Sequence, residues 1–313
     1  MSRTRSADGR PTRCLLLAWI LAGSPACAPV EAPEPDPEDR IEPATPEEPD
    51  PNVLTVQGLS FSRLPPGTFT MGCVPGRDDL TGDCWEAEQP AHEVSLSRPL
   101  WFARTEVTQG QFEALMGYNP ALFPACGADC PMENTTWGEA AGFANALSAL
   151  DGLDACYSCA GERADLSCAP LGDPYACAGY RLATEAEWEY AARGGEDFEF
   201  AGSSDPDDVA WYFDSGGDDT TYPVGTRSPN AFELYDMTGN VWEWVEDRFA
   251  WYPDGPVTDP FQLDSPIPPA QRIKRGGSWG TYPVGLRVSV RHIVPSDQQG
   301  WGLGIRLVRS IDG

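Results

Sequence analysis

The cysteines constrain the fold more than any other feature of the sequence. Ten cysteines occur, and eight of them lie between residues 73 and 177. An even number of cysteines in an exported chain indicates disulfides, although sequence alone permits on the order of a hundred pairings. Because short loops are favoured, we expect the bridges Cys73–Cys84 and Cys126–Cys130, with Cys156–Cys177 nested around Cys159–Cys168.

Zinc is the rival interpretation of the same cysteines. Cys156 and Cys159 have the spacing of zinc ligands. The other half of such a site, Cys168 and Cys177, is too widely spaced for a second tight knuckle, and no histidine lies nearby. A thioredoxin-like motif is also disfavoured, because no βαβ pattern surrounds the pair. The cysteines therefore predict structural staples.

The N-terminal region predicts export. Residues 1–26 combine a basic start with the apolar run LLLAWILAG at 15–23, which is too short to span a bilayer. Cys27 follows small residues and resembles the acylated cysteine of a bacterial lipoprotein, although Ser24 replaces the usual leucine; ordinary cleavage is the alternative. We expect a lipid-anchored protein of the outer membrane or periplasm, in contact with the membrane only through this anchor.

The segment after the signal is a tether. Residues 27–54 alternate proline with acidic residues and contain too few apolar side chains to fold. Proline-rich chain extends by about 3.1 Å per residue, so the segment could hold a domain away from a membrane. We expect the folded domain to cover residues 55–311.

The composition limits both the fold class and the partners. A formal net charge of -27 disfavours nucleic acid as a partner. The 32 glycines and 31 prolines indicate frequent turns, and the 11 tryptophans supply buried area. We expect an α+β fold of low secondary-structure content. Capping signals at Thr108, Thr136 and Thr184 predict helices, and strands are expected within 69–72, 93–107, 272–279, 287–294 and 304–308.

Six sequence blocks occur in an order that resembles the formylglycine-generating enzyme / sulfatase-modifying factor family. They are FTMG at 69–72, EVT at 106–108, YRLATEAEWEYAARG at 180–194, LYDMTGNVWEW at 234–244, RGGSW at 275–279 and GIR at 304–306. The resemblance covers roughly residues 55–310. It implies a large, irregular fold similar to a C-type-lectin-like domain.

The resemblance also implies a copper site that this sequence lacks. Members of the family oxidise a sulfatase cysteine with oxygen and copper, and the soft copper(I) ion requires thiolates. Two cysteines follow the RGGS block in such enzymes, whereas Thr281 and Leu286 occupy these positions here and no cysteine follows Cys177. Ser278, beside the family's active site, is retained. Copper is therefore not expected, and no catalytic residue is assigned.

A related branch of the superfamily holds iron with histidines in a separate helical domain. This chain has only His92 and His292, and its N-terminal region is not helical in pattern. We interpret His292 as a surface or packed histidine.

Calcium and an anionic ligand are the remaining binding expectations. The resemblance implies a calcium loop in which Asp236 and Glu243 give carboxylate oxygens and Gly239 and Val241 give carbonyl oxygens, the ligands that calcium prefers. A second family loop near 209–211 has Val209 in place of the usual asparagine. The resemblance places a substrate near four residues: Trp279, Arg287, Arg291 and Arg306. The alternative for the arginines is that they pair with carboxylates of this protein.

These observations favour a monomeric, non-catalytic binding or scaffold module of the cell envelope, with a peptide, protein or glycan as its partner. The alternative is an oxidoreductase of the formylglycine-generating/non-haem-iron superfamily that modifies a protein or peptide at an unidentified site. True formylglycine generation would need thiolates that the sequence does not supply.

Overall fold

The computed structural model describes residues 50–216, 219–264, 266 and 271–311. The predictions for the signal, the lipidation site Cys27 and most of the tether therefore lie outside the described residues. No helix among the residues described is long and apolar enough to cross a membrane.

Short elements joined by long connections build the domain. The helices are α1 (Gln109–Met116), α2 (Trp137–Leu150), α3 (Glu185–Arg193) and α4 (Pro206–Val209). The strands are β1 (Val53–Val56), β2 (Leu59–Leu64), β3 (Gly67–Met71), β4 (His92–Leu96), β5 (Leu100–Ala103), β6 (Tyr157–Ala160), β7 (Ser167–Pro170), β8 (Tyr180–Leu182), β9 (Trp242–Arg248), β10 (Val257–Thr258), β11 (Gln271–Arg275), β12 (His292–Pro295), β13 (Leu303–Gly304) and β14 (Leu307–Ser310). Single turns of 3-10 helix are η2 (Glu86–Glu88), η3 (Pro124–Cys126), η4 (Arg163–Asp165), η5 (Pro174–Ala176) and η6 (Pro283–Gly285). This is the expected α+β fold with little regular structure.

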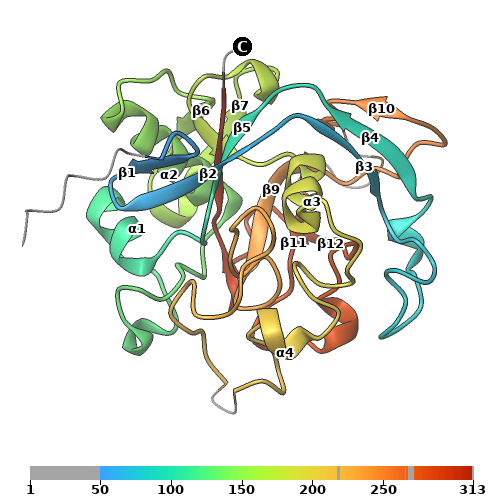
Figure 1. Ribbon diagram of the computed structural model, residues 1–313. Helices are drawn as coiled ribbons and strands as arrows, with labels where there is room; N and C mark the ends of the chain where they lie inside the picture. The colour runs from blue at the N-terminus through green and yellow to red at the C-terminus, as the bar shows by residue number, and fades with distance from the viewer. Residues whose placement is uncertain (1–49, 217–218, 265, 267–270, 312–313) are drawn as a thin grey trace, which may run out of the picture. The chain divides into compact units, whose positions relative to one another are not determined.

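The first and last strands of the described chain belong to one sheet. Its order is β1-β2-β5-β14-β8, so the C-terminal strand β14 lies between β5 and β8. Figure 1 shows the red β14 beside the blue and teal strands of the N-terminal part. The remaining sheets are β10-β4-β3, β12-β11-β9-β13 and the hairpin β6-β7.

Three threonines begin the three longer helices, as predicted. Thr108, Thr136 and Thr184 each accept a hydrogen bond from the third amide of the helix, and the third side chain returns to the cap amide. These capping boxes satisfy two amides that would otherwise lack a partner at each helix start. The helix α3 ends at Gly194, which adopts a left-handed conformation with φ of 61°.

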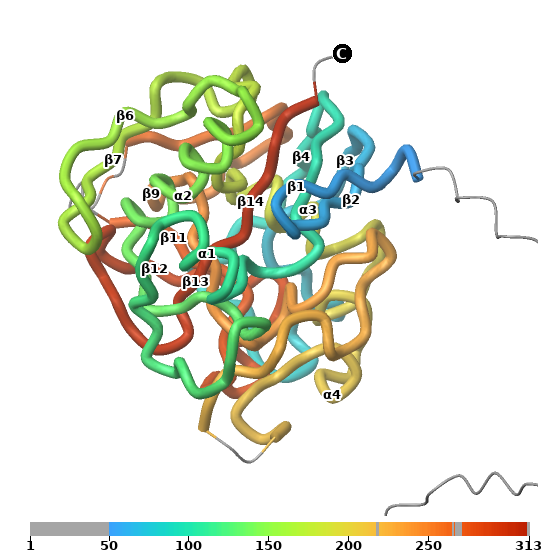
Figure 2. Tube along the Cα trace, turned by 90° about the vertical axis from the view of Figure 1, so that its left-hand side faces the viewer, coloured from blue at the N-terminus to red at the C-terminus, as the bar shows by residue number. Residues whose placement is uncertain are grey.

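All four predicted disulfides are confirmed: Cys73–Cys84, Cys126–Cys130, Cys156–Cys177 and Cys159–Cys168. The last two enclose the hairpin β6-β7, which packs against α2. In Figure 2 this hairpin lies at the left edge, next to α2. The bridges therefore attach a polar insertion to the core.

Some sequence expectations differ from the structure. The stretch 93–107 forms two strands, β4 and β5, because Pro99 between them has no amide to continue a ladder. Leu150, expected on the buried face of α2, is 57 % exposed because it ends the helix. The strand expected at 287–294 begins only at His292, and the strand β9 was not predicted.

Candidate functional site

The loop that precedes β9 brings together the residues predicted to bind calcium. Gly239 adopts a φ of 85°, and an added Cβ would collide with the carbonyl oxygen of Trp211. Its amide donates to the carbonyl oxygen of Gly276 at 2.9 Å. The tight bend predicted at this glycine is therefore present, held against two other segments.

Asp236, which precedes this bend, is buried. Its Oδ2 accepts a hydrogen bond from the amide of Gly225 at 2.6 Å, whereas its Oδ1 has no hydrogen-bond partner among the described residues. Burial raises the pKa of Asp236 to about 6, and the amide of Gly225 opposes this shift. A buried carboxylate oxygen that accepts no hydrogen bond from the described residues is available to bind a cation or a water molecule.

Glu243 is already engaged. Its Oε1 accepts from Nε and Nη2 of Arg306 at 2.8 and 2.7 Å, and its Oε2 accepts from Nε1 of Trp188 at 2.6 Å. All three side chains are buried. The carboxylate is thus neutralised within the protein, and it is a poorer metal ligand than the sequence suggested.

Glu106 is a member of this cluster that the sequence analysis missed. Its carboxylate accepts from the amide of Val241 at 3.0 Å and from Nδ2 of Asn240 at 2.9 Å, so it fixes the loop. Burial and, secondarily, the charge of Asp236 raise its pKa well above the usual range. The available signal was the EVT block at 106–108, to which no role was given.

The chemistry of this cluster fits calcium only in part. Asp236 offers an oxygen, and the bend at Gly239 can present carbonyl oxygens, but Glu243 is paired with Arg306. No group of three or more His, Cys, Asp or Glu side chains that could hold a metal ion occurs among residues 50–216, 219–264, 266 and 271–311. Any cation here would therefore depend on Asp236 and backbone carbonyl oxygens.

Thr281 and Leu286, the two positions that the resemblance assigns to the family's thiols, lie close to packed side chains. Leu286 is fully buried in an apolar cluster that includes Phe200 and Tyr212. The hydroxyl of Thr281 lies 3.2 Å from that of Ser278 and accepts from the Ser278 amide at 3.0 Å. The aliphatic side chain of Leu286 and the hydrogen-bonded hydroxyl of Thr281 offer no thiolate, so these two residues cannot bind copper(I) as cysteines would.

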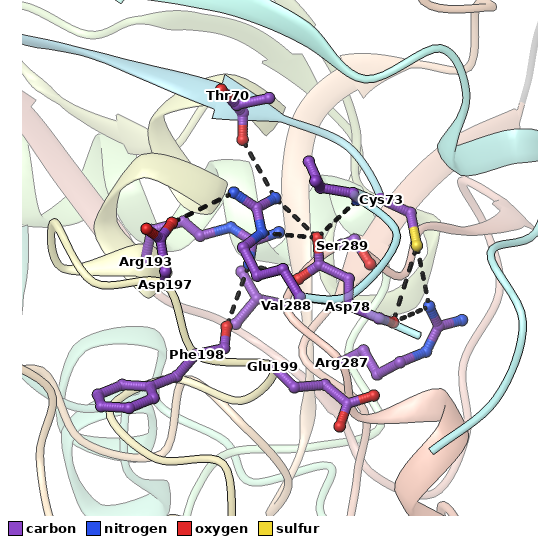
Figure 3. A network of polar contacts seen from close by, with 12 residues as sticks. Thr70, Cys73, Asp78, Arg193, Asp197, Phe198, Glu199, Arg287, Val288 and Ser289 are labelled. Atoms are coloured by element: carbon purple, nitrogen blue, oxygen red, sulfur yellow. Dashed lines mark hydrogen bonds and ion pairs between the residues drawn. The ribbon is translucent and has the colours of Figure 1, made fainter. Parts of the chain in front are cut away.

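The three predicted ligand-binding arginines require a correction. All three side chains are buried inside the domain, where each forms an ion pair with a carboxylate. The pairs are Arg287–Glu88, Arg291–Glu185 and Arg306–Glu243. Pairing with carboxylates was the alternative from the sequence, and the structure supports it. In Figure 3, Arg287 points at the sulfur of Cys73 and the backbone oxygen of Asp78. The side-chain carboxylate of Asp78 pairs with Arg193 instead.

Trp279 lies beside this region and is partly exposed. Its ring packs edge-to-face on Phe123, with 5.4 Å between the centroids. Its Nε1 is buried and has no hydrogen-bond partner within the part of the chain that the structure describes. Trp279 is the one predicted binding residue that retains access to solvent.

The fold and the four bridges define a disulfide-stapled domain of the formylglycine-generating type. Residues 47–311 match the family described as "Sulfatase-modifying factor enzyme 1-like domain". The chain belongs to this family.

Known proteins of two kinds resemble the chain over most of its length. "Chaperone protein LppX" of Paenibacillus barcinonensis is 32 % identical over 82 % of this chain and 96 % of that protein. "Formylglycine-generating enzyme" of Streptomyces coelicolor is 30 % identical over 86 % of this chain and 95 % of that protein.

Solved structures support the same fold. "Treponema denticola variable protein 1" aligns with a TM-score of 0.69 at 29 % identity, covering 82 % of this chain and 98 % of that one. PvdO from Pseudomonas aeruginosa aligns with a TM-score of 0.65 at 26 % identity, covering 83 % of this chain and 98 % of that one.

Proposed function

We propose that the protein is a non-catalytic binding or scaffold module of the cell envelope. The observation that carries this proposal is the occupation of the family's thiol positions by Thr281 and Leu286. Every cysteine in the described part of the chain belongs to a disulfide, so no free thiolate is available there to replace them. Without thiolates, copper(I) has no soft ligands, and the oxidation of a cysteine loses its metal.

The similarity to a protein named as a chaperone supports a binding role. That relative shares the whole domain length with this chain. A role in binding another exported protein or peptide, or a glycan, requires the framework but no redox chemistry. We propose that the protein acts as a monomer.

The oxidoreductase alternative has no comparable support. The side chain of His92 packs on Tyr252, with 4.7 Å between the ring centroids, and lies in the sheet of β4. His292 lies in the sheet of β11 and packs on Trp242. The two histidines therefore belong to different sheets and do not form a shared iron site.

We further propose an anchor at Cys27 that places the domain at the outer membrane or in the periplasm. The small residues before Cys27 and the acidic tether after it support this localisation. Mass spectrometry of the exported protein should find a diacylglycerol-modified Cys27, and Cys27→Ser should abolish membrane association. An unmodified chain in the soluble periplasmic fraction would contradict the anchor.

Calcium binding is proposed at Asp236. The available Oδ1 of Asp236 supports it, whereas the Glu243–Arg306 pair supplies no free carboxylate. The melting temperature should rise with millimolar calcium but not with magnesium, and Asp236→Asn should remove the rise. Asp254→Asn, which changes an exposed carboxylate, is the matched control. Equal melting with calcium and with a chelator would refute the calcium site.

An assay for aldehyde formation tests the absence of catalysis. The full chain is incubated with copper(I), oxygen and a peptide containing Cys-x-Pro-x-Arg, and mass spectrometry monitors conversion of the cysteine. We expect no aldehyde from the wild-type protein. The variant Thr281→Cys/Leu286→Cys should gain copper(I) binding, which spectroscopy with a competing chelator would measure. Aldehyde from the wild-type protein would overturn the proposal.

A further inference from the structure

A cavity of about 520 Å³ lies where the start of α2, the stapled hairpin and the sheet of β9 and β11 meet. Figure 2 shows these elements close together, with β6 and β7 on one side of α2 and β9 and β11 behind it. Two arginines line the cavity, Arg248 and Arg272, together with the carboxylates of Asp165 and Asp297. Neither arginine was considered a binding residue from the sequence.

Arg272 is buried in an unusual way. It is 3 % exposed, and its guanidinium lies 3.7 Å from the centroid of the Trp137 ring. Its Nη1 donates to the backbone carbonyl of Glu246. Within the described residues, no carboxylate lies close enough to form an ion pair with it.

The other buried arginines behave differently. Each forms an ion pair with a buried carboxylate, and these arginines are Arg181, Arg193, Arg275, Arg287, Arg291 and Arg306. The chain has 48 acidic residues against 21 lysines and arginines, so partners are abundant. A buried cation without a partner costs several kcal/mol. The exception at Arg272 therefore requires an explanation.

Arg248 makes the arrangement still less favourable. It lies directly opposite Arg272 in the antiparallel ladder of β9 and β11. Like charges directly opposite each other destabilise a sheet. Burial, as the largest cause, lowers the pKa of Arg272 to about 10; the carboxylate of Glu246 opposes this shift, and the charge of Arg248 adds to it. Among the described residues, Arg248 also forms no ion pair with a carboxylate.

The start of α2 forms one wall of the cavity. Thr136, Trp137 and Gly138, at the start of this 14-residue helix, line the same cavity. The N-terminal end of a helix carries a partial positive charge. The carboxylate of Glu139 accepts from the Thr136 amide, and the Trp137 amide donates to Ser296, so this helix end adds little charge of its own. The two guanidinium groups, neither of which forms an ion pair among the described residues, are therefore the main source of positive potential in this cavity of an acidic protein.

We propose that this cavity binds the oxyanion of a ligand, a carboxylate or a sulfate or phosphate group. Arg272 and Arg248 supply charge-assisted hydrogen bonds to its oxygens. Asp165 and Asp297 at the same cavity disfavour highly charged anions and can accept hydrogen bonds from hydroxyl groups. A singly charged group on a hydroxylated ligand, such as an acidic sugar, matches this combination best.

The anion site is independent of the lost copper chemistry. The two arginines and the helix start lie apart from Thr281 and Leu286, which line no part of this cavity. The wild-type protein could therefore form aldehyde and still bind an anion, or form no aldehyde and bind no anion. Each result would identify which of the two proposals is wrong.

Calorimetric titration of the full chain tests the site. Sodium glucuronate, sodium sulfate, sodium phosphate and uncharged glucose are titrated at constant ionic strength. We expect binding of glucuronate or of an inorganic anion, and no binding of glucose. Arg248→Gln should weaken the binding by about tenfold or more, because one charge-assisted hydrogen bond is lost. Arg63→Gln removes the same charge from an exposed position and should bind as the wild type does.

A second measurement guards against a folding defect. Without anions, Arg248→Gln should melt at the same temperature as the wild type or higher, since it relieves the repulsion across the ladder. Binding of glucuronate alone would assign an acidic sugar, and binding of sulfate or phosphate alone would assign an ester group. Failure of all three anions to bind the wild type, or unchanged binding by Arg248→Gln, would overturn the site.

Discussion

The guanidinium of Arg287 donates two hydrogen bonds to the carboxylate of Glu88, at 2.9 and 3.0 Å, and neither side chain exposes any surface. Ser289 donates a third hydrogen bond to this carboxylate at 2.8 Å. Burial raises the pKa of Glu88, whereas Arg287 acts to lower it. The pair joins the segment after Cys84 to the C-terminal part, and it fixes a guanidinium that could otherwise have faced a ligand.

Removal of one partner of this pair should be strongly destabilising. Glu88→Gln leaves the buried charge of Arg287 without a counter-ion, and we expect a loss of about 3–5 kcal/mol in the free energy of unfolding. Urea denaturation measures this loss. The double variant Glu88→Leu/Arg287→Met removes both charges and should lose less than Glu88→Gln does. If the double variant is the less stable of the two, the ion pair contributes net stability beyond the cost of burying its two charges.

The disulfides should differ in their contribution according to the loop that each one closes. Cys156–Cys177 spans a sequence separation of 21 residues, and Cys126–Cys130 spans 4. Chain entropy predicts that replacing the first pair with serine costs about 1.5 kcal/mol more than replacing the second. Urea unfolding of the two double serine variants compares them directly. A larger loss for the short loop would show that native contacts, not loop length, dominate.

Three buried carboxyl groups should make the protein more stable in mild acid. Burial is the main cause that raises the pKa of Asp236 to about 6, of Glu246 to about 7 and of Asp247 to about 8. The folded state therefore binds more protons than the unfolded state above about pH 4, and the free energy of unfolding should rise as the pH falls from about 8 to about 5. Burial lowers the pKa of His292, so the folded state takes up this proton less readily than the unfolded state. This opposing effect operates only at pH values below the ordinary histidine pKa of about 6.5. Urea midpoints at several pH values test the direction.

Glu246→Gln isolates one of these groups. Oε2 of Glu246 accepts from the hydroxyl of Tyr157 at 2.5 Å, a contact that an amide oxygen can keep. Oε1 of Glu246 accepts no hydrogen bond from the residues that the structure describes. An amide nitrogen at this position therefore breaks none of their hydrogen bonds. The variant should show a shallower pH dependence between about pH 5 and pH 8 than the wild type. An unchanged slope would assign the dependence to other groups.

Local signals were sufficient to predict the helix starts and the staples. A capping threonine and its third-residue partner act within one turn, so Thr108, Thr136 and Thr184 could be recognised from their immediate neighbours. The disulfides followed from short separations along the chain. The strand β9 was missed because it is buried on both faces and shows no alternation: six of its seven residues are buried, including the charged Glu243.

The candidate site was only partly predictable, because its interactions join distant segments. Arg306 and Glu243 are 63 residues apart, and Arg287 and Glu88 are 199 apart. A sequence shows that arginines and carboxylates are present, but it does not show which of them meet. The anion cavity was missed for the same reason, since Arg272 gains its significance only from having no ion-pair partner among the described residues.

The bend at Gly239 should be intolerant of any side chain. Two glycines have similar left-handed conformations, Gly239 with φ of 85° and the exposed Gly195 with φ of 79°. Alanine at either position incurs a conformational penalty of about 1–2 kcal/mol. At Gly239 the added Cβ would also meet the backbone of Trp211, which cannot move as a side chain would, whereas at Gly195 it would meet nothing within 4 Å. Gly239→Ala should therefore lose clearly more stability in urea than Gly195→Ala, and tryptophan fluorescence should report the displacement of the loop. Equal losses in the two variants would show that the conformational penalty alone operates, and that the loop containing Asp236 and Gly239 can widen without cost.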